Sequence, residues 1–328
     1  MRILITGMAG FIGHAVAKKL AVLGHDLIGI DNLNDYYDVS LKRARLNDLS
    51  VFSNVNFIQL DLADREGIAE LFKRESFDTV IHLAAQAGVR YSLENPHAYA
   101  ESNLIGHLNI LEGCRHSEVK HLLYASSSSV YGENSKTPFA VTDRVDEPVS
   151  LYAATKKANE LMSYTYSHLY GLSATGLRFF TVYGPWGRPD MALFKFTKNI
   201  LQNIPIDVYN QGNMQRDFTY IDDIVESIIR LLELPPETEF GQAPHKVYNI
   251  GNGSPVALMD FIRAIEQATD KQAICNYMPM QPGDVSRTWA DTEALFIRTN
   301  YRPVIKVQEG VNRFVDWYCS FYKLGNQK

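Results

Sequence analysis

The chain contains 328 residues with a formal net charge of −5; 46% of the residues are hydrophobic and 21% are charged. This composition is typical of a soluble globular protein with a substantial core. It gives no reason to expect a nucleic-acid partner, although a local basic cleft for a phosphate ligand remains open. No apolar run approaches the length of a membrane span, and three widely spaced cysteines favour reduced thiols over a disulfide framework. We therefore expect a cytoplasmic protein with no membrane or nucleic-acid partner.

The first 31 residues have the pattern of a dinucleotide-binding βαβ unit. A β-branched run at 2–6 precedes a glycine loop and a helical pattern, and a second strand at 26–30 ends on Asp31. The loop provides a tight turn, close approach of backbone to a pyrophosphate at the helix N-terminus, and close helix packing, through Gly7, Gly10 and Gly13. Asp31 is expected to accept hydrogen bonds from the adenosine ribose and to repel a 2′-phosphate, which favours NAD over NADP. Because residues 2–6 belong to the fold, we expect no signal peptide.

A basic helix and a third strand come next. The helix contains Lys42, Arg43 and Arg45, and we expect a solvated charged face, with contact to bound cofactor or substrate as the alternative. Residues 55–59 predict the third strand. Asp61 lies just beyond it, at the edge where ligands of doubly wound folds bind, and is expected to meet the adenine amino group.

A fourth strand is predicted at 78–82. The small residues that follow it let the backbone pass close to the phosphates and ribose of a cofactor. Arg90, a cation just past this strand, is equally consistent with an anionic ligand and with a surface position. A long helix from about 97 to 115, which contains Asn103, is expected afterwards.

Strand five is predicted at 121–125 and runs into four serines at 126–129, which are poor strand and core residues and are expected to present hydroxyls at the catalytic edge. The next helix carries Tyr152 and Lys156, four residues apart and therefore on one face. A nearby ammonium lowers the pKa of a phenol, so we expect Tyr152 to act as a general base. Ser127 is expected to share the proton and hold a substrate hydroxyl.

The alternation of strands and helices breaks near residue 180, where glycines and prolines accumulate, so a second domain is predicted to begin there. A helix at 221–234 is expected to return to the nucleotide domain, and a late strand follows at 246–250. The remaining predicted elements are a strand at 172–178, a helix at 193–202, a strand at 206–209, a loop at 279–291 and an amphipathic helix at 307–322.

At this point the sequence resembles a known family. The Thr-Gly-x-x-Gly-x-x-Gly spacing is similar to that of extended short-chain dehydrogenases/reductases, and longer stretches resemble the UDP-glucuronate 4-epimerases over nearly the whole chain. The most specific are DNLNDYYDVSLKRARL (31–46), HLAAQAGVRYS (82–92), SLYAATKKANELM (150–162), LRFFTVYGPWGRPDMALFKF (177–196) and RDFTYIDDIV (216–225).

The resemblance implies an α/β, extended Rossmann fold with a doubly wound parallel sheet and a smaller C-terminal substrate domain. It divides the chain into an NAD-binding domain at 1–180, to which 220–251 returns, and a sugar-nucleotide domain at 181–328. It also implies tightly bound NAD that is not consumed, and a homodimer formed through helices of the first domain.

The resemblance also assigns residues. Ser127, Tyr152 and Lys156 form the catalytic set, with serine where many relatives have threonine. Arg216 corresponds to an arginine that binds the UDP diphosphate, a task suited to a bidentate guanidinium; Asp284 sits where relatives contact the uridine ribose. The expected cofactor contacts are Gly7, Gly10, Phe11, Ile12, Gly13, Asp31, Asn32, Asp61, Leu62, Leu83, Ala84, Ala85, Gln86, Asn103, Tyr152, Lys156 and Phe180. The expected substrate contacts are Arg90, Ser127, Ser128, Ser129, Tyr152, Thr181, Arg188, Arg216, Asp284 and Arg287, the last without a family pattern.

The implied reaction is 4-epimerisation of UDP-glucuronate to UDP-galacturonate through a 4-keto intermediate. Because that intermediate is a β-keto acid, the carboxylate must be held near the ring plane, by hydroxyls of Ser128, Ser129 and Thr181, with Arg188 or Arg90 supplying attraction. The alternatives are a UDP-glucuronate decarboxylase and a neutral UDP-hexose 4-epimerase. A 4,6-dehydratase is disfavoured, because two serines replace its Asp-Glu pair. A non-catalytic NAD-sensing protein is disfavoured by the Tyr/Lys pair, and a metalloenzyme by the lack of a histidine ligand motif.

Overall fold

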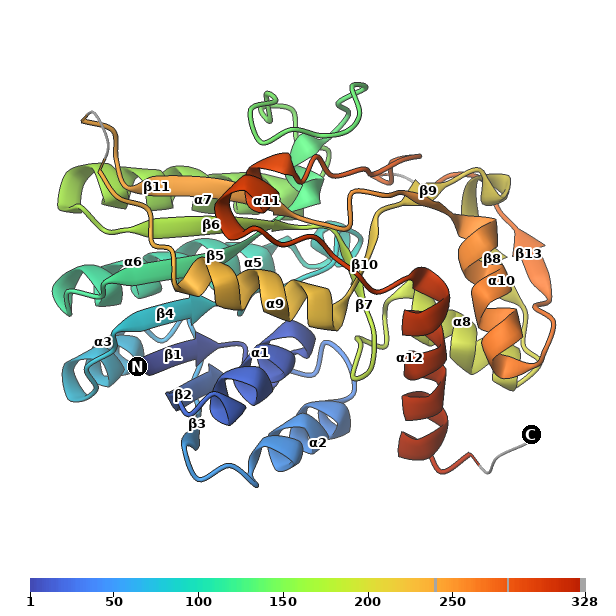
Figure 1. Ribbon diagram of the computed structural model, residues 1–328, viewed down its shortest axis with the longest axis horizontal. Coiled ribbons are helices and arrows are strands. Elements are labelled where there is room, and N and C mark those ends of the chain that lie inside the picture. The colour runs from blue at the N-terminus through green and yellow to red at the C-terminus, as the bar shows by residue number, and fades with distance from the viewer. Residues whose placement is uncertain (239–240, 282, 325–328) are drawn as a thin grey trace.

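A seven-stranded parallel sheet organises the molecule in the computed structural model, which describes residues 1–238, 241–281 and 283–324 (Figure 1). The strand order is β11-β6-β5-β4-β1-β2-β3. The strands are β1 (Arg2–Thr6), β2 (Asp26–Asp31), β3 (Val55–Gln59), β4 (Thr79–His82), β5 (His121–Ser127), β6 (Ala174–Phe179) and β11 (His245–Ile250). The order reverses direction at β1, which creates the switch point where ligands of doubly wound folds bind. The predicted parallel α/β fold is confirmed.

Helices cover both faces of the sheet (Figure 1). On one face, α1 packs against both α2 and α9; on the other, α6 packs against α3 and α7. The bounds are α1 (Phe11–Val22), α2 (Val39–Leu49), α3 (Arg65–Arg74), α6 (Gly106–His116), α7 (Leu151–Tyr170) and α9 (Ile221–Leu232). The helix predicted at 97–115 is interrupted by a π-helical segment. It consists of three consecutive helical segments, α5 (Pro96–Tyr99), η1 (Ala100–Ile105) and α6.

The C-terminal elements form a second group beside the sheet (Figure 1). They contain three two-stranded ladders, β7 (Thr181–Tyr183) with β10 (Phe218–Tyr220), β8 (Ile206–Val208) with β13 (Cys275–Tyr277), and β9 (Gln215–Arg216) with β12 (Val256–Ala257). The helices of this group are α8 (Ala192–Leu201), α10 (Leu258–Thr269) and α12 (Val307–Phe321). The short helix α11 (Glu293–Thr299) instead packs over the sheet, against β11 and α9. Short helical turns complete the chain at α4 (Tyr91–Glu94), η2 (Ser128–Tyr131) and η3 (Tyr209–Gly212). Of the predicted 279–291 loop, residue 282 lies outside the described residues.

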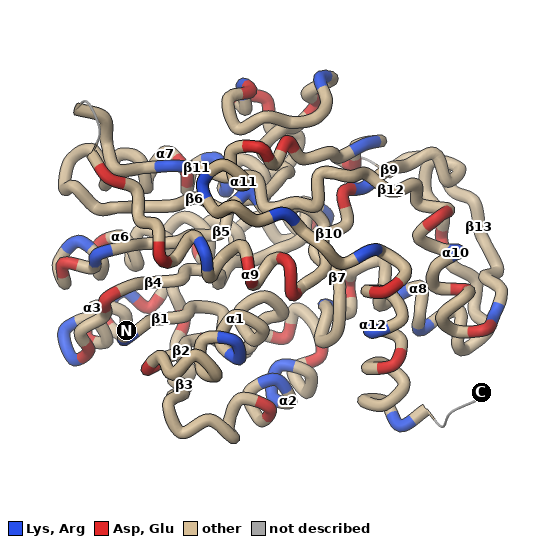
Figure 2. Tube along the Cα trace, in the orientation of Figure 1, with Lys and Arg blue, Asp and Glu red and all other residues tan. Residues whose placement is uncertain are grey.

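One expectation about α2 is wrong. Figure 2 shows basic residues gathered along this helix, as the sequence suggests, but Arg45 is 0% exposed and Lys42 is 5% exposed. Lys42 Nζ donates to Asn34 Oδ1 at 2.8 Å, and the Arg45 guanidinium donates to backbone carbonyls. A buried guanidinium is tolerated because these acceptors satisfy its N–H groups. The helix therefore presents two of its cations inward.

The cysteines carry no disulfide. No disulfide joins Cys114, Cys275 or Cys319, and Cys114 is buried. Burial raises the pKa of the Cys114 thiol, so it behaves as a small apolar core residue.

Candidate active site

The carboxyl ends of the central strands bring the predicted site residues to one edge. In the sheet register Thr6 lies beside both Ile30 and His82, and Ser127 lies beside Phe179. Residues directly after β1, β2, β4, β5 and β6 therefore open onto the same space.

The loop after β1 leaves no room for side chains. Gly7 has φ +73°, and a Cβ there would lie 2.8 Å from the backbone nitrogen of Ala84. A Cβ on Gly13 would lie 2.0 Å from the Gly7 carbonyl oxygen, so the start of α1 packs directly on the loop. Gly10 precedes α1 without a side-chain cap, so the first N–H groups of the helix are available to an anion.

Two carboxylates follow β2 and β3. Asp31 is 9% exposed; its Oδ1 accepts from the Leu33 N–H at 2.8 Å and lies 3.7 Å from Lys42 Nζ. Asp61 is exposed and accepts from Asn32 Nδ2 at 2.8 Å. Both acids have oxygens that can accept hydrogen bonds from an adenosine, the first at the ribose and the second at the adenine.

A single cavity of about 940 Å³ joins these elements. All but two of the predicted site residues line it: Gly7, Gly10, Phe11, Ile12, Gly13, Asp31, Asn32, Asp61, Leu62, Leu83, Ala84, Ala85, Gln86, Arg90, Ser127, Ser128, Ser129, Tyr152, Lys156, Phe180, Thr181, Arg188, Arg216 and Asp284. The roles assigned to them from sequence stay predictions.

The other two predicted residues lie outside the lining. Asn103 is buried behind the site, where its amide exchanges hydrogen bonds with the backbone of Gln86 at 2.8 and 3.0 Å. It supports the wall of the cavity instead of facing it. Arg287 stacks its guanidinium 4.8 Å from the ring centre of Trp289.

The catalytic candidates meet at one point of this cavity. Ser127 ends β5, and Tyr152 lies in the first turn of α7, where Ser150 Oγ caps the helix by accepting from the Ala153 N–H at 3.1 Å. The Ser127 hydroxyl lies close enough to the Tyr152 phenol to act on its pKa. Lys156 Nζ donates to the carbonyl of Ala125 on β5 at 3.0 Å. The phenol, the serine hydroxyl and the ammonium are thus anchored to the same strand end.

The titration behaviour differs from the sequence prediction. Burial raises the pKa of Tyr152, while the Ser127 hydrogen bond and the charge of Arg188 act against it. Burial lowers the pKa of Lys156 to about 8. The Lys156 ammonium donates to a backbone carbonyl, and the cation that acts against the raised pKa of the phenol is Arg188. A contribution of Lys156 to the acidity of Tyr152 stays a prediction.

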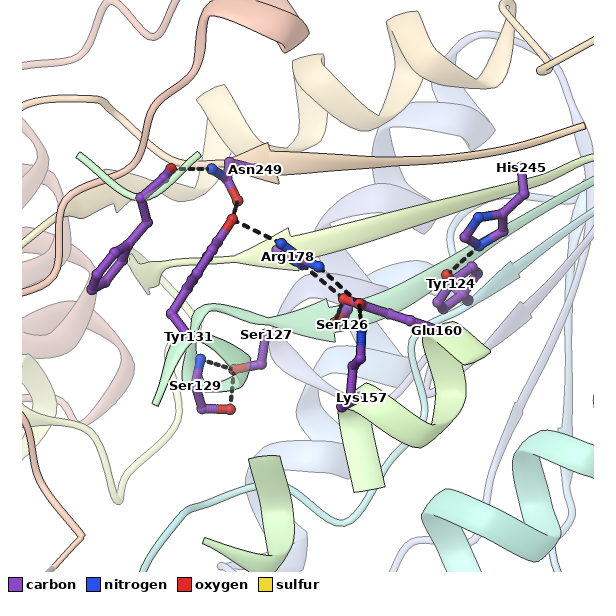
Figure 3. Close-up of polar contacts among 11 residues, drawn as sticks. Tyr124, Ser126, Ser127, Ser129, Tyr131, Lys157, Glu160, Arg178, His245 and Asn249 are labelled. Carbon is purple, nitrogen blue, oxygen red and sulfur yellow. Dashed lines mark hydrogen bonds and ion pairs between the residues drawn. The ribbon is translucent and has the colours of Figure 1, made fainter. Parts of the chain in front are cut away.

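A buried polar network supports the catalytic strand end from behind (Figure 3). Glu160 Oε1 accepts from Ser126 Oγ at 2.6 Å and from Arg178 Nε at 2.8 Å. Arg178 Nη1 donates to the Tyr131 hydroxyl at 2.9 Å, and that hydroxyl donates to Asn249 Oδ1 at 2.6 Å. The network links α7, β5, β6 and β11 around Ser127 and Lys156.

Cations occupy two separate parts of the cavity. At one, Arg216 Nη2 donates to Asp284 Oδ1 at 2.8 Å, and Arg90 Nη2 lies 3.7 Å from Asp284 Oδ2. At the other, Arg188 forms a forked pair with Asp190 and acts on the titration of Tyr152. Arg90 therefore belongs with the Arg216 group, and Arg188 belongs with the catalytic group.

Sequence reasoning missed several residues of the site. Tyr36 lines the cavity and donates its hydroxyl to Asp190 at 3.3 Å, and Asp190 itself lines the cavity. Asp190 stands two residues after Arg188, a spacing that gives no signal in an irregular segment. For Glu160 the sequence does contain a signal, because Glu160 lies four residues after Lys156 on the same helix face.

Among residues 1–238, 241–281 and 283–324, no group of three His, Cys, Asp or Glu side chains is arranged to hold a metal ion. In the same part of the chain, no helix combines the length and apolar character that crossing a membrane requires.

Comparison with known proteins adds to this geometry. The model of the NAD dependent epimerase/dehydratase family matches residues 3–251. The probable UDP-glucuronate 4-epimerase of Rhizobium meliloti (strain 1021) is 51% identical over 98% of this chain and 98% of its own. The Bacillus cereus UDP-glucuronic acid 4-epimerase, solved with UDP-glucuronic acid and NAD, superimposes with a TM-score of 0.90 at 32% identity, over 98% of this chain and 100% of its own. The UDP-glucose 4-epimerase of Thermotoga maritima, solved with UDP-glucose, gives 0.88 at 29% identity over 98% and 100%.

Proposed function

Because this chain belongs to the NAD dependent epimerase/dehydratase family, we propose that it is an isomerase that interconverts UDP-glucuronate and UDP-galacturonate through a 4-keto intermediate, with no net redox change. The observation that carries the proposal is the meeting of Ser127, Tyr152 and Lys156 in the same cavity as a glycine loop and two cationic groups. That cavity has room for a dinucleotide and a sugar nucleotide together.

The residues present fit NAD. The glycine loop and the uncapped start of α1 hold the pyrophosphate, and Asp31 holds the adenosine ribose and disfavours a 2′-phosphate. Bound NAD supplies the acceptor for the C4 hydride and later its donor, together with the positive charge of its oxidised ring. The enclosing contacts of Asn103 and Gln86 support tight retention of the cofactor.

The chain's own groups move the proton. Tyr152, once deprotonated, takes the proton of the C4 hydroxyl, and Ser127, close to the phenol, hydrogen-bonds the same hydroxyl. Arg216 binds the diphosphate, and its partner Asp284 accepts from the uridine ribose. The UDP moiety stays anchored there while the 4-keto sugar turns over and presents its opposite face.

The carboxylate of the substrate needs its own control. A 4-keto glucuronate is a β-keto acid and loses carbon dioxide when the breaking bond overlaps the carbonyl. We assign the task of holding the carboxylate near the ring plane to hydroxyls of Ser128, Ser129 and Thr181, with Arg188 as the attracting charge. The influence of Arg188 on the pKa of Tyr152 supports this choice over Arg90, which lies with Asp284 and Arg216 in the other arginine group.

One incubation separates this proposal from its rivals. With UDP-glucuronate and no added NAD, the purified protein should give UDP-galacturonate, identified by chromatography and NMR. UDP-xylose or a pentose ketone would instead select the decarboxylase, and turnover of UDP-glucose alone would select the neutral epimerase. Tyr152→Phe is the control: it should bind UDP and lose turnover, and activity equal to the wild type would remove Tyr152 from the mechanism.

We also propose the assembly, domain organisation and location. Residues 1–180 with 220–251 form the NAD domain, and the rest of 181–328 forms the sugar-nucleotide domain.

Exposed apolar side chains on α6 and α7 support a homodimer through these helices; Leu161 is 56% exposed and Tyr164 is 51% exposed. Leu161→Asp should therefore halve the mass measured by light scattering. Three cysteines without a disulfide are consistent with the cytoplasm.

A further inference from the structure

Arg45 of α2 is a buried cation that the proposed reaction does not use. Its side chain is 0% exposed. Its hydrogen-bond acceptors among the described residues are backbone carbonyls and one phenol: Nη1 donates to Ala9 O at 2.9 Å and to the Tyr37 hydroxyl at 2.7 Å, and Nη2 donates to Trp186 O at 2.6 Å. A guanidinium buried without a hydrogen-bonded carboxylate is costly, so the contacts it makes are informative.

Its two backbone targets belong to different parts of the site. Ala9 lies within the glycine loop, between Gly7 and Gly10. Trp186 lies 141 positions away from Arg45 in the chain, two residues before Arg188. The planar fork of one guanidinium therefore ties the dinucleotide loop to the turn that carries Arg188, whose charge acts on the catalytic phenol.

That turn is strained and packed from the other side as well. Trp186 has φ +65°, which is rare for a bulky residue and costs free energy unless its surroundings hold it. Its ring lies 5.2 Å from His14 of α1 and 5.3 Å from Trp317 of α12, measured between ring centres. Arg45 binds the carbonyl of the same residue, so backbone and ring are fixed by separate contacts.

We infer that Arg45 is a positioning residue, which sets the place of the Trp186–Arg188 turn relative to the glycine loop and so fixes the guanidinium that attracts the substrate carboxylate. This inference rests on the proposed function, because it assigns to Arg45 an effect on an acidic sugar. Lysine cannot replace it, since a single ammonium has no rigid fork to span both carbonyls.

Calorimetric binding to the NAD-loaded protein tests the inference. Arg45→Lys keeps the charge and should weaken UDP-glucuronate binding about tenfold, while binding of UDP, which lacks the carboxylate, changes by less than about twofold. Arg298→Lys is the matched control: Arg298 also donates to backbone carbonyls, those of Leu234 and Pro235, but does not line the cavity, and both affinities should stay unchanged.

A double-mutant cycle tests whether Arg45 acts through Arg188. If Arg45 acts through Arg188, Arg45→Lys should have no further effect on UDP-glucuronate affinity once Arg188→Met is present. Equal loss of UDP and UDP-glucuronate binding in Arg45→Lys would mean a structural role and overturn the inference. So would a cycle in which Arg45→Lys and Arg188→Met weaken UDP-glucuronate affinity independently, by the product of their separate effects. Should Arg45→Lys fail to fold, Trp186→Ala loosens the same turn through its ring and must show the same selective loss. A wild type that neither binds nor converts UDP-glucuronate would instead refute the proposed function.

Discussion

Glu160 is the side chain whose loss should damage this protein most without touching substrate. It is 4% exposed, and its two oxygens accept from Arg178 at 2.8 and 2.9 Å and from Ser126 at 2.6 Å (Figure 3). Glu160→Gln keeps the shape of the side chain and removes its charge. Arg178, itself 3% exposed, is then a buried cation without a carboxylate partner. The amide oxygen of the glutamine can replace one of the two lost acceptors, and the Tyr131 hydroxyl remains the other side-chain partner in the network.

Breaking one partner of a buried ion pair costs about 3–5 kcal/mol. For a chain of this size roughly 2 °C of melting temperature corresponds to 1 kcal/mol, so the expected fall is roughly 6–10 °C. Replacing both partners is less damaging than replacing one, because no charge remains uncompensated. Glu160→Met combined with Arg178→Met should therefore recover a large part of the loss.

Thermal unfolding followed by circular dichroism measures these effects. The control is Asp146→Asn, which breaks an exposed pair, Arg144–Asp146, whose side chains are 78% and 54% exposed; its loss should stay below about 1 kcal/mol. A Glu160→Gln variant no less stable than Asp146→Asn would refute the reasoning, because the pair would then contribute no more than a solvated one.

The dependence on pH gives an independent check of the same pair. Burial acts to raise the pKa of Glu160, but the hydrogen bond and charge of Arg178 outweigh it and hold that pKa below the ordinary value of 4.5. The stabilisation is therefore fully present above pH 4.5 and is lost as the pH falls through the lowered folded-state value. The difference in melting temperature between wild type and Glu160→Gln should narrow correspondingly below pH 4.5.

Three further outcomes are expected. Arg188→Met should move the acidic limb of the kcat/KM pH profile to higher pH, because the Arg188 charge lowers the pKa of Tyr152; an unshifted limb would contradict that coupling. Asp31→Ser should weaken NAD binding about tenfold and admit NADP, measured by equilibrium titration, whereas unchanged discrimination would remove Asp31 from the ribose site. Thr181→Val should raise the share of decarboxylated product in a chromatographic assay, and a wild-type product ratio would free Thr181 from any role at the carboxylate.

The sheet was predictable because its signals are local. Each parallel strand is a short apolar run, so β1 to β6 fall close to their predicted ranges. The glycine loop and the Tyr152–Lys156 spacing are local patterns too. Their positions in the cavity follow from the rule that parallel strands end at one edge.

What the sequence hid depends on contacts between distant segments. The burial of Arg45 depends on a carbonyl 141 positions away, and a basic helix with the same composition is normally solvated. Lys156 has the predicted spacing from Tyr152, yet its ammonium donates to a backbone carbonyl of β5, a contact that no sequence periodicity reveals. The pairing of Arg90 with Asp284 likewise arises only when the C-terminal elements fold against the sheet.

These long-range contacts match a requirement of the proposed chemistry. A sugar that is oxidised on one face and reduced on the other must rotate its ring within the site while its nucleotide stays bound. The two cationic groups must therefore keep a fixed separation through the cycle. Arg45 ties the Arg188 turn to the glycine loop, and Asn249 ties β11 to the carbonyls of Phe139 and Asp291 at 2.7 and 2.9 Å. Rigid links of this kind hold the frame steady, so that the movement is confined to the substrate, and weakening either one should lower epimerisation more than binding of UDP.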